Sequence, residues 1–229
     1  ALSRAVPNDA VVLSRMDGHA TLVNAAAMRA ANLTAQTQDP SGGRIEHAAD
    51  GSPTGVLVDA AMGLVNRQVP PATKEQTKTA VRAAIAEMNR WGLTSVHDAG
   101  VARGVIDVYE EVAREGNFNI RDYVMVANNG SSINHYLQRG PQSGLYDGRL
   151  WIKAIKISAD GALGSRGAAL IEPYSDDPRN SGLALVPAGR VREVAVKALR
   201  AGFQVNVHAI GHRANRTALN EFEEACNQV

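Results

Sequence analysis

Two stretches of the chain carry side chains of the kinds that bind metal ions. Residues 204–208 read Gln-Val-Asn-Val-His, and on the two-residue period of a strand Gln204, Asn206 and His208 share one face. The stretch runs into Gly211 and a helical pattern, as a barrel strand does before a βα loop. We therefore expect His208 at the active-site end of a strand, where an imidazole has the chemistry of a metal ligand. From the strand alone, a hydrogen-bonded structural histidine is the commoner explanation.

The second stretch, residues 150–158, contains a lysine in an apolar strand pattern. Ala154, Lys156 and Ser158 share one face, and Lys156 lies between two isoleucines. An unpaired ammonium is costly to bury, so Lys156 is expected to be solvated, chemically modified or paired with a carboxylate such as Asp160. The following residues, 160–166, predict a loop with a role in the active site.

Six short motifs occur in the order in which they are found in one protein family. They are MDGHATLVN at 16–24, DPSGG at 39–43, GSPTGVL at 51–57, GLTSV at 92–96, KISADGALGSR at 156–166 and VHAIG at 207–211. With these motifs the chain resembles the YtcJ-like branch (amidohydrolase family 3) of the metal-dependent amidohydrolase superfamily. Any one motif is weak evidence, but six in order are specific, and together they span nearly the whole chain.

The resemblance implies a (β/α)₈ barrel enzyme that hydrolyses amide-like C–N bonds of small molecules with one or two divalent metal ions, zinc foremost. Lys156 matches the family's fourth-strand ligand, a lysine or carboxylated lysine, and His208 matches the fifth-strand histidine. The chain has no His-x-His pair, and no residue matches the family's eighth-strand aspartate, which serves as general base. We therefore expect an internal fragment that is inactive by itself.

Six further side chains are predicted to contact substrate, some from the resemblance and some from their positions in loops or at strand ends: His19, His97, Asp160, Ser165, Arg166 and His212. Each has a structural alternative, such as a turn aspartate, a solvated arginine or a packed turn histidine. The sequence departs from the family pattern at Gly167, where threonine is usual, and at His212, where aspartate is usual. The second exchange replaces an anion by a mostly neutral, titratable group.

The chain divides into two predicted regions. Residues 1–72 are rich in turn formers and are expected to form an inserted α+β region, which in the family packs over the barrel mouth. Residues 73–229 alternate helix and strand patterns, starting with a capping box at Thr73 and Gln76. Alternation predicts a parallel sheet with outer helices, here about four units of a partial (β/α)₈ barrel. Half a barrel has open edges, so we expect a homo-oligomer.

Composition limits the partners. The 229 residues carry a net charge of +1 with both signs mixed throughout, which gives no reason to expect a nucleic-acid or membrane partner. No stretch approaches the roughly 18 apolar residues of a membrane span. The single cysteine, Cys226, excludes an intramolecular disulfide. We expect a cytoplasmic protein.

Two other classes of function stay open at this stage. Lys156 is also a candidate for a Schiff-base lyase or aldolase, if its amine is desolvated and nucleophilic. Alternatively, the chain is a degenerate, non-catalytic amidohydrolase-like binding module. Borohydride trapping of a carbonyl substrate on Lys156 distinguishes the lyase from the other two.

The chain as given is expected to bind divalent metal weakly and to show no hydrolase activity, because two ligands do not close a tetrahedral site. Elemental analysis of the purified protein should find metal well below one ion per chain. A stoichiometric metal together with amidase turnover would overturn this expectation.

Overall fold

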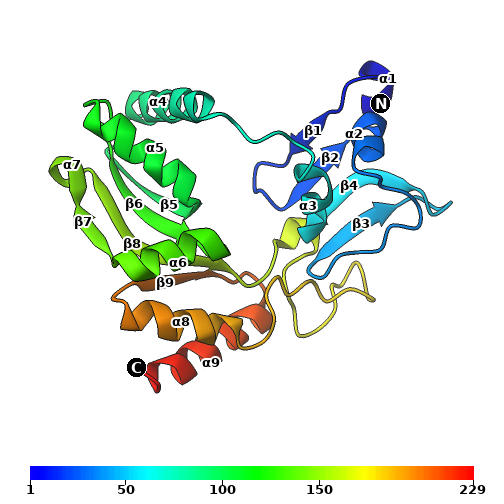
Figure 1. The fold of residues 1–229 in the computed structure, drawn as a ribbon. Helices are drawn as coiled ribbons and strands as arrows, with labels where there is room; N and C mark the ends of the chain where they lie inside the picture. Colours follow the sequence, from blue (N-terminus) through cyan, green and yellow to red (C-terminus); the bar gives the residue numbers. More distant parts are fainter. The chain divides into compact units, whose positions relative to one another are not determined.

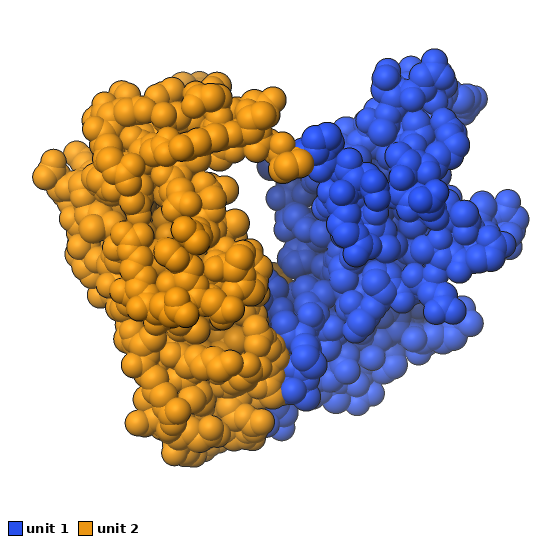
Figure 2. Space-filling model, in the orientation of Figure 1, with its two compact units in different colours: residues 1–70, 158–188, 209–220 blue, residues 71–157, 189–208, 221–229 orange.

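The chain folds into two units, each assembled from three separate stretches of sequence (Figures 1 and 2). The computed structural model describes residues 1–229. Unit 1 contains Ala1–Pro70, Ser158–Ala188 and Ala209–Asn220. Unit 2 contains Pro71–Ile157, Gly189–His208 and Glu221–Val229. Each unit is described by itself.

Unit 1 is built on a four-stranded antiparallel sheet with the order β1-β2-β4-β3. The strands are β1 (Val12–Ser14), β2 (Ala20–Val23), β3 (Gly43–His47) and β4 (Pro53–Asp59). Short helices accompany them: α1 (Leu2–Ala5), α2 (Ala25–Ala30), η1 (Ala60–Met62) and α3 (Gly63–Asn66). The core of this unit gathers around the fully buried Leu57, with Val23, Ala27, Ile45 and Val65. Its two later stretches add η2 (Leu163–Ser165) and the first part of α9 (His212–Cys226).

Unit 2 is built on a largely parallel sheet. Its strands are β5 (Ser95–Val101), β6 (Arg121–Ala127), β7 (Gln142–Gly144), β8 (Leu150–Ser158) and β9 (Gln204–His208). Strand β6 pairs in parallel with β5 and with β8, β9 also pairs with β8, and the short β7 is antiparallel to β8. The sheet is open, and β5 has one strand neighbour only.

Helices flank the sheet of unit 2 (Figure 1). They are α4 (Lys74–Arg90), α5 (Arg103–Arg114), α6 (Gly130–Arg139), α7 (Leu145–Gly148) and α8 (Arg190–Arg200). On α5, Ile106 and Val112 are fully buried, as expected for a helix with one apolar stripe against a sheet. Val124 and Val126 of β6 are fully buried, while the residues that alternate with them, Tyr123, Met125 and Ala127, are half-buried, so the two faces of the sheet differ. The prediction of a mixed α/β fold with a parallel sheet is confirmed.

The predicted start of α4 is confirmed in detail. Gln76 N–H donates to Thr73 Oγ1 at 3.2 Å, and Thr73 N–H donates to Gln76 Oε1 at 2.8 Å. Strands β2, β3 and β7 were not predicted. The first stretch of unit 1 ends at Pro70, close to the predicted boundary at residue 72. Unit 1 also includes two later stretches of the chain. The division at residue 72 stays a prediction. No helix is both long and apolar enough to span a bilayer.

Strand β5 generates a prediction about assembly. An unpaired strand edge is a template for pairing with another chain, and the side chains of Ser95 and Ala99 on β5 are exposed. We expect light scattering to show a mass that rises above that of one chain as the protein is concentrated. The double variant Ser95→Lys/Ala99→Lys should stay monomeric, because charge on an edge opposes pairing. Ala83→Lys, an exposed position on α4, is the matched control. A wild-type protein that is monomeric at every concentration would contradict the prediction.

Candidate active site

One face of the sheet in unit 2 carries a row of polar and aromatic side chains. The His97 ring of β5 stacks on Tyr123 of β6, with ring centroids 5.2 Å apart. Tyr123 Oη donates to Gln204 Oε1 of β9 at 2.9 Å. These contacts place His97, Tyr123 and Gln204 on the same face. By the two-residue period, Asn206 and His208 continue that face toward the end of β9.

Lys156 lies near the end of β8, opposite Ala127 of β6 in the parallel register. Its side chain is half-buried, and its Nζ donates to the carbonyl oxygen of Ile157 at 3.2 Å. Burial lowers the pKa of the Lys156 ammonium, because desolvation disfavours the charged form. Less free energy is therefore needed to form the neutral amine, which is the form that reacts with CO₂ or a carbonyl carbon.

His208 ends β9, the strand that pairs with β8. Each of these two paired strands therefore carries a nitrogen-bearing side chain near its carboxyl end. Two residues earlier, Asn206 Oδ1 is buried and has no hydrogen-bond partner. Buried polar atoms are normally satisfied, so an amide oxygen without a partner is unusual.

The chain supplies only part of a metal site. No group of three or more His, Cys, Asp or Glu side chains lies close enough together to hold a metal ion. Lys156 and His208 are suitable donors, since a carboxylated lysine and an imidazole both bind zinc-like cations. They fit as two members of a larger donor set.

Asp160, predicted to contact substrate, has a structural role in unit 1. It is fully buried, and its carboxylate accepts backbone N–H bonds from Ala169 (2.8 Å), Ile210 (2.9 Å) and Gly211 (2.8 Å). The bonds tie the segment after β8 to the segment after β9. Gly211 is required there, because a Cβ would lie 1.9 Å from the Ala169 carbonyl oxygen.

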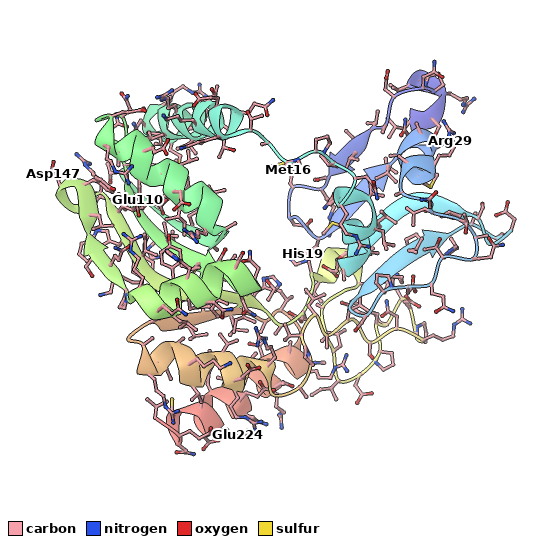
Figure 3. The ribbon with its side chains drawn as sticks, viewed as in Figure 1. Met16, His19, Arg29, Glu110, Asp147 and Glu224 are labelled. Atoms are coloured by element: carbon pink, nitrogen blue, oxygen red, sulfur yellow. The ribbon has the colours of Figure 1, made fainter.

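His19 forms a pair with Asp59, a residue that the sequence did not single out. His19 Nδ1 and Asp59 Oδ1 are 2.7 Å apart, with side-chain exposures of 16% and 1%. His19 directly precedes β2 and is labelled in Figure 3. A Cβ on either Gly161 or Gly167 would lie 2.2 Å from Asp59 Oδ2. Glycine at both positions therefore leaves room for this carboxylate.

The backbone at Asp59 is also unusual, with a φ of 48°. A non-glycine residue at positive φ is strained, and such strain persists only where the surroundings hold it in place. A buried carboxylate that receives the Nδ1 proton fixes the tautomer and the orientation of an imidazole. The geometry is that of a positioned histidine.

The other predicted substrate residues each have a local partner. Ser165 Oγ donates to the Ala162 carbonyl oxygen at 3.1 Å, and Arg166 forms an ion pair with Asp176 at 2.9 Å. His212, the first residue of α9, accepts the Ile171 N–H at Nδ1, at 2.9 Å. These contacts match the structural alternatives considered above. The substrate roles of these residues stay predictions.

Comparison with known proteins decides the family. The model described as "Amidohydrolase family" matches residues 1–229. The chain belongs to the amidohydrolase family. It is 37% identical to the putative amidohydrolase YtcJ of Bacillus subtilis (strain 168), covering 97% of this chain and 42% of that protein. It is 27% identical to N-substituted formamide deformylase of Arthrobacter pascens, covering 99% of this chain and 43% of that protein.

A solved structure is similar as well. An uncharacterized metal-dependent hydrolase from Pyrococcus furiosus matches with a TM-score of 0.69 and 27% identity over 94% of this chain and 44% of that one. The chain thus spans less than half the length of these relatives.

Asp160→Ala in this family member is expected to destabilise the chain by about 3 kcal/mol or more, because three buried N–H groups lose their acceptor. Urea unfolding followed by circular dichroism measures the change. Asp176→Ala removes an exposed carboxylate and should change stability by less than about 1 kcal/mol. Equal losses in the two variants would show that the Asp160 bonds do not hold unit 1 together.

Proposed function

We propose that this chain is part of a metal-dependent hydrolase that cleaves amide-like C–N bonds, other than peptide bonds, in small molecules. The observation that carries the proposal is the position of Lys156 and His208 at the ends of two paired strands. Membership of the amidohydrolase family and similarity to a structure described as a metal-dependent hydrolase support it.

The parallel sheet of unit 2 with its flanking helices is then an arc of a (β/α)₈ barrel. In such barrels the active site lies at the carboxyl ends of the strands, where side chains from different strands converge. Lys156 and His208 both occupy that end of their strands. The face with His97 and Tyr123 would line the interior of the barrel.

Lys156, in carboxylated form, and His208 would hold a divalent cation, with zinc the best match to these donors. When bound, the cation polarises the carbonyl group under attack and makes a water molecule acidic enough to act as nucleophile. The remaining donors would come from parts of the family fold outside this chain. Asn206 Oδ1, which has no partner in the chain, would accept a hydrogen bond from the N–H of an amide substrate.

In unit 1, His19 would handle a proton or a hydrogen bond from substrate. Because Nδ1 faces Asp59 at 2.7 Å, the Nδ1 proton is held there and Nε2 is the basic nitrogen. Asp59 acts through His19 and is a positioning residue. Ser165 and Arg166, in the loop that follows β8, would orient the substrate.

A Schiff-base lyase is the second candidate, favoured by the lowered pKa of Lys156. Both candidates use a neutral Lys156 amine, so the pKa alone does not separate them. Borohydride in the presence of a carbonyl substrate would trap a covalent adduct on Lys156 in a lyase and none in the hydrolase.

The metal assignment is tested in a longer protein that contains these residues together with the family's other ligands. His208→Ala should remove most of the metal and lower turnover by orders of magnitude, because a lost ligand changes both metal affinity and the acidity of bound water. Lys156→Ala should do the same, with partial rescue by short-chain carboxylic acids that occupy the vacated position. His135→Ala, on α6, is the control. Full metal content and near-normal turnover in His208→Ala would show that β9 is not part of the metal site.

A further inference from the structure

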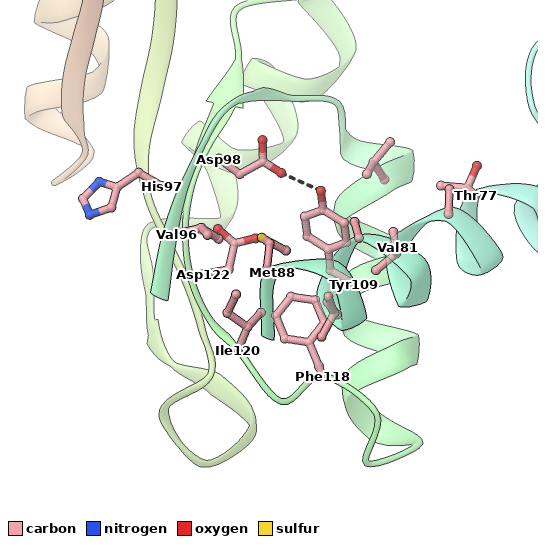
Figure 4. Close-up of a pocket in the computed structure, with 14 residues that line it drawn as sticks. Thr77, Val81, Met88, Val96, His97, Asp98, Tyr109, Phe118, Ile120 and Asp122 are labelled. Atoms are coloured by element: carbon pink, nitrogen blue, oxygen red, sulfur yellow. Dashed lines mark hydrogen bonds between the residues drawn. The ribbon is translucent and has the colours of Figure 1, made fainter. Parts of the chain in front are cut away.

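A cavity of about 500 Å³ lies within unit 2, between helices α4 and α5 and the helix-covered face of β5 and β6 (Figure 4). Most of its wall is apolar. The apolar side chains come from Ala80, Val81, Ala84, Ile85, Met88, Val96, Val105, Phe118 and Ile120. Val81 and Met88 on α4 are only half-buried, so the cavity is open to small molecules.

Two carboxylates enter this apolar space from neighbouring strands. Val96 pairs with Asp122, and Asp98 pairs with Val124, in the parallel register of β5 and β6. Paired residues share a face, so Asp98 and Asp122 both lie on the helix-covered face. Asp98 Oδ2 accepts the hydroxyl proton of Tyr109 at 2.6 Å (Figure 4).

Asp122 is the unusual member of the pair. It is 4% exposed, and its Oδ1 atom has no hydrogen-bond partner. Burial, together with the neighbouring Asp98 charge, raises the pKa of the Asp122 carboxyl to about 7, against a hydrogen bond from the Asp98 backbone N–H that lowers it. A carboxylate without a partner in an apolar wall destabilises the fold unless a hydrogen-bond donor or a cation reaches it.

The chain itself supplies no such cation. None of the residues that line the cavity is lysine or arginine. His97 belongs to the lining strand, but its ring points away from Asp98 (Figure 4) and stacks on Tyr123 at the other face of the sheet. The cavity is therefore apolar with a net negative end.

We propose that this cavity binds an organic ammonium ion, with its hydrocarbon body among the side chains of α4, Phe118 and Ile120 and its ammonium group against Asp122 and Asp98. The fit is one of charge and of surface: the carboxylates match the cation, and the apolar wall matches the body. The site lies on the opposite face of the sheet from Lys156 and does not depend on the proposed hydrolase activity.

Other occupants match the cavity less well. A hard metal cation needs about six oxygen ligands, and the lining offers two carboxylates and two hydroxyl groups, on Thr77 and Tyr109, in an apolar wall. An organic anion would be repelled by Asp98 and Asp122. A neutral apolar molecule would bury Asp122 Oδ1 further without giving it a partner.

Hexylamine, hexanol and hexanoate test the proposal, because they share one body and differ in charge. Binding is followed by calorimetry and by changes in the backbone amide signals of residues 77–122. Hexylamine should bind at least about tenfold more tightly than hexanol, since an ion pair inside an apolar site is worth more than a neutral hydrogen bond. Hexanoate should not bind measurably.

Variants then assign the effect to the pair. Asp122→Asn keeps the shape and removes the charge, so it should weaken hexylamine at least about tenfold and leave hexanol unchanged, which also shows that the cavity is intact. Asp98→Asn should weaken hexylamine in the same direction. Asp107→Asn, an exposed carboxylate on the same helix as Tyr109, is the matched control and should have no effect. Three results would each overturn the proposal: equal affinity for hexylamine and hexanol, no binding of either, or an unchanged affinity of the Asp122→Asn variant for hexylamine.

Discussion

The carboxylate of Asp160 is the constraint on which the arrangement of unit 1 depends. It is fully buried and accepts three backbone N–H groups, from Ala169, Ile210 and Gly211. A buried carboxylate is stable only when hydrogen-bond donors surround it. The same hydrogen bonds fix the positions of the three N–H groups. The loops after β8 and β9 consequently share one anchor. Those loops follow β8 and β9 directly in the chain.

The sheet of unit 2 illustrates how strand alternation separates two kinds of chemistry. On β5, His97 faces Tyr123 and the polar row, whereas Asp98 faces Tyr109 and the apolar cavity. Successive side chains point to opposite faces, so one strand serves both without any change in backbone. A shift of register by one residue would exchange the two sets. The pairing of β5 with β6 is therefore as important to either site as the side chains themselves.

Local patterns predicted what local interactions decide. The capping box at Thr73 and Gln76 gave the start of α4, and strand periodicity gave the faces of Lys156 and His208. The pairing of His19 with Asp59 was missed, because the partners are 40 positions apart. The glycines that make room for Asp59 are about a hundred positions further on, and no spacing rule connects them. Strand β3 was missed because Arg44 and Glu46 interrupt its apolar pattern.

The bonds of Asp160 also set an order of events during synthesis of the chain. The antiparallel sheet of β1 to β4 consists of contacts that are close in sequence, and it can form early. The N–H of Gly211, which donates to Asp160, lies 51 residues further along the chain. Until that residue has been synthesised, the carboxylate lacks two of the three backbone donors named above, those of Ile210 and Gly211. This set of bonds in unit 1 can therefore be completed only after Gly211 has been synthesised.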